Sequence, residues 1–371
     1  MTRSRMLSSM LSAIALFLSG GVPALAVQYT SLDPGYTQEI YTGPLVGGPG
    51  MAWTSTNQLL TRNGSDILEY SFAQNAIHQG TSIHSSIATH SIAGLATSGY
   101  GMTNGLDGYV YTITGSGLQR FNPSNWAAPA QTLAGTITGG QGYGITTLPD
   151  GRIAYSDGVG GASSVWIYDP VAATNTLIHS GNSLIDGMVA GPTGNIAVTG
   201  QDNSTITILS NTGTVINTFS TFHFPDGLAF SAVPGSTSLY SNNNDGTITR
   251  YDLGPGFLGT PTYTDIATGS GAYGDLASVG PDCAFYVSQF DNFGFHGSTP
   301  GIGTHWDNGT TNNEPSIIRI GGVPAPDGSE VCLFYTPFEH DIPEPGSVVL
   351  MSFGIVALAG VAYRRRQLAR V

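Results

Sequence analysis

The sequence predicts an all-β domain made of repeated sheets, and three observations support this prediction. Glycine is abundant, with 52 among 371 residues, whereas only 9% of the residues are charged. Short runs with apolar residues at alternate positions recur between turn sequences such as Pro149-Asp150-Gly151. No stretch between residues 27 and 342 has the apolar spacing of an amphipathic helix.

One pattern returns six times along this region: a glycine, an apolar residue, a small residue, a turn and two short β runs. The clearest copies are residues 143–170, 186–213 and 226–254. The leading glycines are 40 to 51 residues apart, and they are Gly50, Gly101, Gly144, Gly187, Gly227 and Gly274. A period in the forties built from short strands is typical of a β-propeller in which each repeat forms one four-stranded blade.

We therefore predict a six-bladed β-propeller over residues 27–342, with seven blades as the alternative. Strand-like runs remain at both ends of this region, such as residues 39–43 and 331–337. One terminus can complete a blade that the other begins, so that no sheet edge stays open. The termini could instead form a divergent seventh blade.

The net charge of the predicted domain limits the kinds of molecule that it can bind. All eleven positive residues of the chain are arginines, and residues 27–342 hold 5 of them against 23 acidic residues, a net charge of 18 negative. Such a surface repels nucleic acid and anionic lipid, so we expect no nucleic-acid partner.

The N-terminus has the pattern of a signal peptide. Arg3 and Arg5 precede an apolar run from Met6 to Leu18, and Ala24 and Ala26 occupy the small-residue positions before a cleavage site. We predict that residues 1–26 are a signal peptide removed by signal peptidase, and that the mature protein is exported.

The C-terminus has the pattern of a membrane span followed by a cytoplasmic stub. Residues 347–363 carry no formal charge, and as a helix they would reach about 25 Å, enough for a thin bilayer. Arg364, Arg365 and Arg366 open a basic cluster over residues 364–370, which should stay on the cytoplasmic side. We predict a transmembrane helix over 347–363, with the folded domain outside the cell membrane.

The order of Pro343-Glu344-Pro345, apolar span and arginine cluster resembles the PEP-CTERM sorting signal of Gram-negative bacteria that export polysaccharide. The resemblance covers residues 343–371. It implies that an exosortase of the inner membrane recognises and cleaves the tail of an anchored precursor, which then moves to the cell surface or extracellular matrix. A permanent single-pass anchor with a proline-containing stalk is the alternative.

The repeats themselves resemble the NHL, gluconolactonase-like and streptogramin-lyase-like propellers. The likeness is a diffuse pattern, a Gly-apolar-small strand followed by a Pro/Asp-Gly turn, and the clearest copy runs from Tyr143 to Pro170. It implies the architecture more strongly than any activity, because one fold hosts many functions.

Residues that precede the leading glycines are expected at the inner ends of the blades, facing the central channel. Tyr100, Tyr143 and Tyr273 are candidate ligand contacts, and Asp186 and Asp226 are candidate ligands for Ca²⁺, which prefers hard oxygen atoms. Because gluconolactonase-like relatives use a channel metal, the resemblance leaves a metal-dependent lactonase or lyase open. The structural alternative is that these residues serve turn geometry.

The two cysteines, Cys283 and Cys332, lie in the exported part and predict one disulfide that joins the last blade to the C-terminal strand. Between them runs the longest irregular stretch, residues 291–314, in which Trp306 is a candidate for stacking on a sugar.

These observations favour a non-catalytic binding role over an enzymatic one. The expected partners are the signal peptidase and exosortase during export, and afterwards a polysaccharide or a surface protein. No cofactor is expected for that role, whereas the alternative lactonase or lyase would require Ca²⁺ at Asp186 and Asp226.

Overall fold

The structure is a computed structural model that describes residues 29–42, 50–70, 86–97, 101–133, 142–157, 163–269, 273–290, 315–323 and 331–338. The chain divides into two units, Met1–Pro337 and Phe338–Val371, and every strand found in the described residues belongs to the first unit. The predicted signal peptide and the predicted span over 347–363 lie outside the described residues. Within those residues, no helix is long and apolar enough to cross a membrane.

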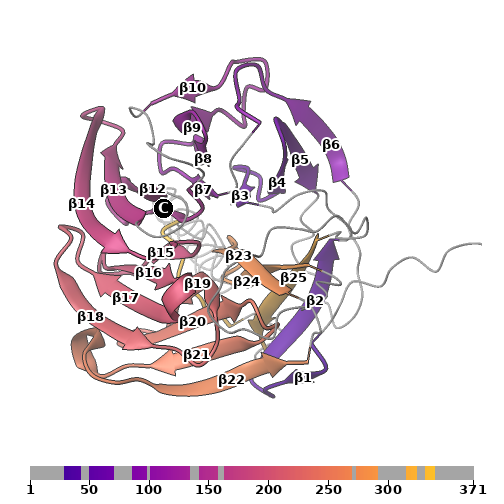
Figure 1. Cartoon of the computed structure of the whole chain (residues 1–371). Coiled ribbons are helices and arrows are strands. Elements are labelled where there is room, and N and C mark those ends of the chain that lie inside the picture. Colours follow the sequence, from indigo (N-terminus) through magenta and orange to yellow (C-terminus); the bar gives the residue numbers. More distant parts are fainter. Residues whose placement is uncertain are drawn as a thin grey trace, which may run out of the picture. The chain divides into compact units, whose positions relative to one another are not determined.

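The described strands form six antiparallel sheets, which we call blades 1 to 6 (Figure 1). Blade 1 consists of β3 (Met51–Trp53), β4 (Leu59–Asn63), β5 (Asp66–Tyr70) and β6 (Ser86–Ser91). Blade 2 consists of β7 (Met102–Asn104), β8 (Val110–Thr114), β9 (Gly117–Phe121) and β10 (Gln131–Thr132). Blade 3 consists of β11 (Ile145–Thr147), β12 (Ile153–Asp157), β13 (Ser163–Asp169) and β14 (Thr174–Asn182). Blade 4 consists of β15 (Met188–Ala190), β16 (Ile196–Gly200), β17 (Thr205–Leu209) and β18 (Val215–Ser220).

Blades 5 and 6 combine the two ends of the propeller. Blade 5 consists of β19 (Pro225–Phe230), β20 (Ser238–Asn243), β21 (Ile248–Asp252) and β22 (Thr262–Thr268), with β1 (Ser31–Leu32) added at its outer edge. Blade 6 consists of β23 (Tyr273–Val279), β24 (Phe285–Phe290), β25 (Pro315–Gly322) and the N-terminal β2 (Tyr36–Thr42). Two short 3₁₀ turns, η1 (Gln201–Asn203) and η2 (Pro255–Phe257), lie in connections of blades 4 and 5.

The blades close into a ring. Their first strands contact one another in the order β3, β7, β11, β15, β19, β23 and back to β3. β2 pairs with β25, so an N-terminal strand completes a blade whose other three strands are C-terminal. The prediction of six blades with shared termini is confirmed, and the described termini do not form a seventh blade.

The antiparallel order of each blade places its connections on two opposite faces. The upper face holds the connections between blades, such as residues 221–224. It also holds the connections from second to third strands, such as residues 244–247. We call lower the face that holds the connections from first to second and from third to fourth strands, such as residues 280–284 and 170–173. The residues before each leading glycine therefore lie on the upper side of the ring.

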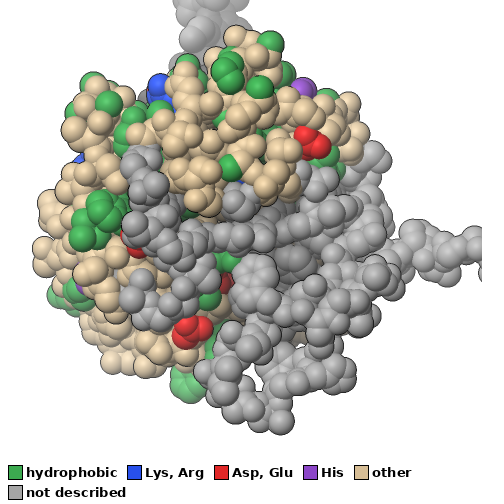
Figure 2. Space-filling model, turned by 45° about the horizontal axis from the view of Figure 1, so that its top comes forward, with side chains coloured by type: hydrophobic (Ala, Val, Ile, Leu, Met, Phe, Trp, Pro, Cys, Tyr) green, Lys and Arg blue, Asp and Glu red, His purple; other side chains and the backbone are tan. Residues whose placement is uncertain are grey.

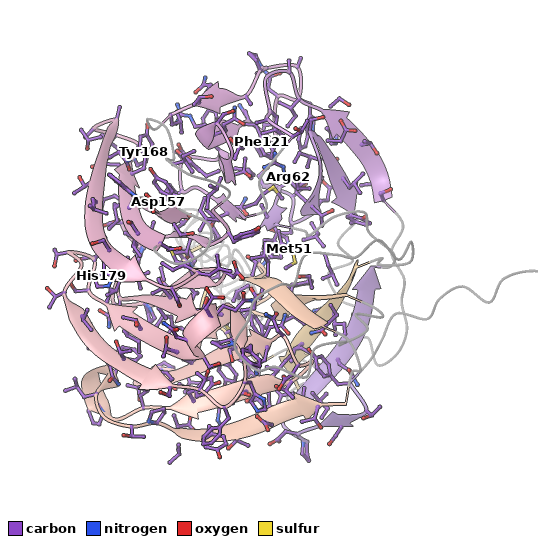
Figure 3. The ribbon with its side chains drawn as sticks, in the orientation of Figure 1. Met51, Arg62, Phe121, Asp157, Tyr168 and His179 are labelled. Atoms are coloured by element: carbon purple, nitrogen blue, oxygen red, sulfur yellow. A yellow bond between two sulfur atoms is a disulfide. The ribbon has the colours of Figure 1, made fainter. Side chains whose placement is uncertain are left out.

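The hydrophobic core lies in layers between adjacent blades. One layer combines Ala154 and Val165 of blade 3 with Met188 and Val198 of blade 4, all of them buried. Successive residues of a strand face opposite neighbouring blades, so both surfaces of a sheet are covered. Side chains such as Phe121 in Figure 3 belong to these layers, and this double burial explains the low charge of the strands.

Each of the five arginine side chains of the propeller forms hydrogen bonds inside the fold or an ion pair with a nearby aspartate. Arg62 is buried and donates hydrogen bonds to the Gly64 carbonyl oxygen at 2.9 Å and to Thr112 Oγ1 of the neighbouring blade, also at 2.9 Å (Figure 3). The other four form ion pairs, namely Arg120 with Asp107, Arg152 with Asp150, Arg250 with Asp252 and Arg319 with Asp282. Few charged side chains appear on the described surface in Figure 2.

The leading glycines allow the inner strands of neighbouring blades to touch through their backbones. A Cβ atom on Gly187 would overlap the carbonyl oxygen of Asp226, and one on Gly101 would overlap the carbonyl oxygen of Tyr143. No side chain fits between these strands. The glycine repeat that reveals the propeller in the sequence is therefore a steric requirement of the ring.

A C-terminal strap, residues 331–337, closes the lower side of blades 5 and 6. Tyr335 N donates to the Phe230 carbonyl oxygen at 2.8 Å, and Phe334 is fully buried against the rings of Tyr240 and Phe285. A disulfide joins Cys332 in the strap to Cys283 in the turn between β23 and β24.

Replacing Gly187 by alanine should lower the free energy of unfolding by at least about 2 kcal/mol, because the new methyl group has no space against Asp226. Urea denaturation measures the change. Gly35→Ala is the matched control, since a Cβ there would lie 3.6 Å from the nearest atom, Asp33 Oδ1, and should change stability by less than about 0.5 kcal/mol. Equal losses in the two variants would contradict the steric account.

Replacing both Cys283 and Cys332 by serine should lower the free energy of unfolding by about 2–4 kcal/mol, because the disulfide restricts the unfolded chain. A reducing agent should cause the same loss in the unmodified protein and none in the variant. Denaturation curves with and without the agent test this, and an unmodified protein indifferent to reduction would refute it.

Candidate functional site

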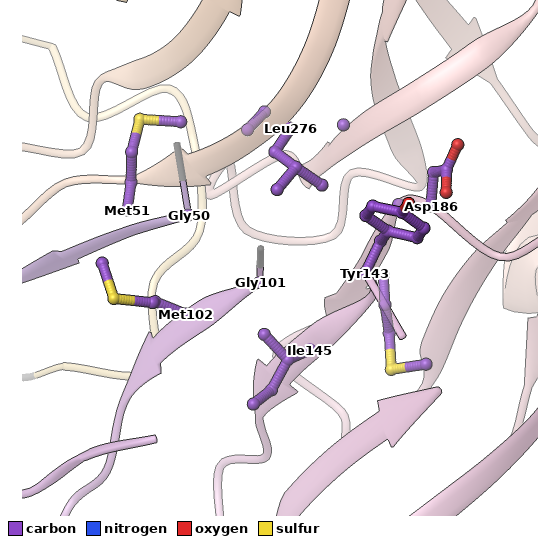
Figure 4. A pocket seen from close by; sticks show the side chains of 12 residues that line it. Gly50, Met51, Gly101, Met102, Tyr143, Ile145, Asp186 and Leu276 are labelled. Atoms are coloured by element: carbon purple, nitrogen blue, oxygen red, sulfur yellow. The ribbon is translucent and has the colours of Figure 1, made fainter. Parts of the chain in front are cut away.

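A small cavity lies at the centre of the ring. Its volume is about 20 Å³, and it is lined by glycines and by side chains on or just before first strands, which include Tyr143, Ile145, Asp186 and Leu276 (Figure 4). This volume is enough for about one water molecule. Tyr143 is itself buried and packs against Leu184 and Leu276, so it contributes to the core at the centre of the ring.

The two candidate carboxylates are buried on the upper side of the ring. Asp186 is 3% exposed and lines the cavity, whereas Asp226 is 1% exposed and lies outside the cavity lining. Asp226 Oδ2 accepts a hydrogen bond from Gln201 Nε2 at 3.0 Å, and the Asn244 amide can donate to the same oxygen at 3.1 Å. Three upper-face connections thus meet at Asp226.

The structure does not describe the side chains of the remaining predicted ligand-binding and sorting residues. Tyr273 begins β23, but its side chain lies outside the described part of the chain. Tyr100, Trp306, the Pro343–Pro345 motif and the Arg364–Arg366 cluster also lie outside the described residues. Among the described residues, no three His, Cys, Asp or Glu side chains gather to hold a metal ion.

A wider groove of about 480 Å³ lies on the lower face between blades 2 and 3, lined by Asp107, Asp150 and Asp169 among others. Each of these aspartates caps its own turn: Asp150, for example, accepts from Arg152 N at 3.1 Å, and Asp169 from Val171 N at 2.8 Å. The carboxylates of this groove therefore serve the turns that form it.

The outer rim between blades 4 and 5 holds a charged cluster that the sequence did not single out. His223, in the connection from β18 to β19, lies between two carboxylates of blade 5. Its Nδ1 bonds Asp245 Oδ2, and its Nε2 lies 3.3 Å from Asp265 Oδ1. Thr247 and Thr249 donate their hydroxyl groups to Asp245 and Asp265 at 2.7 and 2.8 Å.

This arrangement shifts the pKa values of both partners. The hydrogen bond to Asp245 is the main cause that raises the pKa of His223, helped by the charges of Asp245 and Asp265 against a smaller opposing effect of burial. Burial acts to raise the pKa of Asp245, but the hydrogen bonds from His223 and Thr247 outweigh it and lower that pKa. The imidazolium and its two carboxylates therefore stabilise one another.

Two aromatic rings lie beside this cluster. Phe222 precedes His223, and Tyr263 lies two residues before Asp265 on β22. Their ring centroids are 4.5 Å apart, and the ring planes are tilted by 38°. The only signal in the sequence was the Phe222-His223 pair just ahead of a leading glycine; the partners from β22 follow from tertiary structure alone.

Replacing His223 by glutamine should destabilise the propeller by roughly 1 kcal/mol in mildly acidic solution, a charge-assisted contribution reduced for partial solvent exposure. A histidine with a raised pKa stabilises below its unfolded value near 6.5, and this effect fades as pH rises through the folded value. The lowered pKa of Asp245 removes the effect again as pH falls below about 4.

Urea denaturation at pH 5.5 and pH 9 tests this expectation, and the difference between variant and unmodified protein should be largest at the lower pH. His179→Gln is the control, because His179 on β14 makes no ion pair within the described residues. A loss that is independent of pH would show that His223 acts through packing alone.

Comparisons with known proteins agree with the fold and with the C-terminal motif. A family model for the PEP-CTERM protein-sorting motif matches residues 341–366. No curated protein matches the sequence. Solved structures do match in fold. A luciferin-regenerating enzyme has a TM-score of 0.54 and 11% identity, over 78% of this chain and 96% of that one.

Two further solved structures belong to the groups that the repeats resemble. A protein assigned as a gluconolactonase has a TM-score of 0.50 and 13% identity, over 79% of this chain and 97% of that one. A streptogramin B lyase has a TM-score of 0.48 and 11% identity, over 78% and 98%. At these identities the likeness concerns the fold. The chain is thus a six-bladed β-propeller protein with a C-terminal PEP-CTERM sorting motif, which marks it for export and for processing by an exosortase.

Proposed function

We propose that this exported propeller is a non-catalytic binding protein of the cell surface or extracellular matrix of a Gram-negative bacterium, and that its ligand is a polysaccharide. The observation that carries the proposal is the burial of the candidate residues Tyr143, Asp186 and Asp226 around a small central cavity. A cavity of about 20 Å³ admits no sugar, and Asp186 and Asp226 are both almost fully buried. Binding is therefore assigned to the outer surface of the propeller.

The composition of that surface supports a neutral glycan. The net charge of residues 27–342 is strongly negative, which disfavours acidic polymers and nucleic acid. All five arginines of this region are engaged inside the fold or with local aspartates, so none is dedicated to an anionic ligand. Exposed aromatic side chains, by contrast, offer apolar faces with polar groups close by.

A metal-dependent lactonase or lyase is the second candidate, with Ca²⁺ held by Asp186 and Asp226. One observation favours it: two carboxylates and the amides of Gln201 and Asn244 lie on the upper side of the ring, and these are ligand types that Ca²⁺ accepts. However, Gln201 directs its N–H group at Asp226 Oδ2, so this amide acts as a donor to the carboxylate and does not offer its carbonyl oxygen to a shared cation. We therefore rank this candidate below the binding role.

The protein purified from its native host, with and without the exosortase, tests the proposal. Mass spectrometry should show loss of the chain beyond Pro343-Glu344-Pro345 only when the enzyme is present. The processed protein should sediment with the host polysaccharide and be released by an excess of the soluble polymer. Processed protein that fails to bind polysaccharide, yet hydrolyses a sugar lactone with Ca²⁺ and loses this activity in Asp226→Asn, would establish the second candidate instead.

A further inference from the structure

The rim between blades 4 and 5 exposes two aromatic rings that the fold does not need to expose. Phe222 is 72% exposed and Tyr263 is 48% exposed, and the two rings contact each other at a centroid distance of 4.5 Å. Aromatic rings gain most by burial, so a contacting pair left in solvent is typical of a binding surface.

The backbone that carries Phe222 is held on both sides. Thr221 N donates to the Ser204 carbonyl oxygen at 2.7 Å, and Thr221 Oγ1 donates to the His223 carbonyl oxygen at 2.6 Å. His223 is itself fixed between Asp245 and Asp265. The Phe222 ring is therefore carried by an ordered turn, so binding of a ligand to it costs no conformational entropy for ordering that turn.

Polar groups stand next to the rings. Tyr263 and Asp265 are two residues apart on β22, so they face the same side of the strand. Asp265 Oδ1 accepts from His223 and Thr249, whereas Asp265 Oδ2 and the Tyr263 hydroxyl make no hydrogen bond with the described residues. An acceptor and a group that can donate or accept thus flank the aromatic surface.

This combination fits the chemistry of a sugar ring. A hexopyranose presents an apolar face of C–H groups that packs on an aromatic ring, and hydroxyl groups at its edge that donate to a carboxylate. Asp245 and Asp265 would repel a uronic acid or a phosphate. A stable protein interface would need about 1,200 Å² or more of buried surface, far beyond a pair of rings.

We propose, building on the polysaccharide-binding function above, that Phe222 and Tyr263 stack against a neutral hexopyranose unit of a polysaccharide while Asp265 accepts a hydrogen bond from one of its hydroxyl groups. The site lies on the outer rim of the propeller, where an extended polymer can pass without entering the central channel. His223 is a positioning residue that holds Asp265 beside the rings.

Affinity electrophoresis of the full chain through gels that contain dextran, mannan or galactan tests the site, with alginate as the acidic polymer. Phe222→Ala and Tyr263→Ala should each weaken binding to the best neutral polymer at least tenfold, whereas Tyr263→Phe should keep most of the stacking. The melting temperature should stay unchanged, because both side chains are largely exposed. Leu177→Ala is the matched control, an exposed apolar residue, 48% accessible, on blade 3.

The outcomes separate the site from the general function. Equal binding by Phe222→Ala, Tyr263→Ala and the unmodified chain would overturn the site but leave the polysaccharide-binding function standing. A chain that binds no polymer would overturn both. Preferential retention by alginate would overturn the assignment of a neutral sugar. A loss in Leu177→Ala as large as that in Phe222→Ala would show that exposed apolar area, rather than this pair of rings, drives binding.

Discussion

Backbone contact between neighbouring first strands is the constraint on which the rest of this propeller depends. At Gly101 and Gly187 the next blade approaches so closely that an added methyl group would overlap its backbone. This contact draws the blades together, and Tyr143, Ile145 and Leu276 line a cavity of about 20 Å³ at the centre of the ring. The small size of this cavity is the reason why the proposed binding is assigned to the connections and outer strands.

The sequence predicts the architecture well because the architecture is local and repeated. Each leading glycine, turn and alternating strand belongs to one blade, and the pattern can be recognised copy by copy. A second repeat becomes visible only in the structure: Thr112, Ser156 and Thr199 on second strands each form a hydrogen bond with the leading glycine of their own blade. The candidate site was harder to foresee. Phe222 and Tyr263 belong to different blades and meet only through the geometry of packed sheets.

The aspartates likewise differ in whether their hydrogen-bond partners come from the same blade or from another one. In blades 2 and 6 a turn aspartate accepts from a tyrosine four residues later and from an arginine of the third strand: Asp107 with Tyr111 and Arg120, and Asp282 with Tyr286 and Arg319. Both aspartates lie in turns between the first and second strands, where this residue type is common. Asp226, expected at the inner end of its blade, accepts a hydrogen bond from Gln201 in a connection of blade 4, a contact between blades that the sequence pattern does not reveal.

The C-terminal strap has a mechanical consequence for a chain whose tail is held and cut by a membrane enzyme. Tension applied beyond residue 337 first strains the contacts of Phe334 and Tyr335 with blades 5 and 6. At Cys332 it meets a covalent bond, which passes the load to Cys283 in the inner turn of blade 6. The pairing of β2 with β25, which closes the ring, is thereby kept out of the line of force. Pulling on the tail therefore loads the propeller at its centre instead of peeling open its seam.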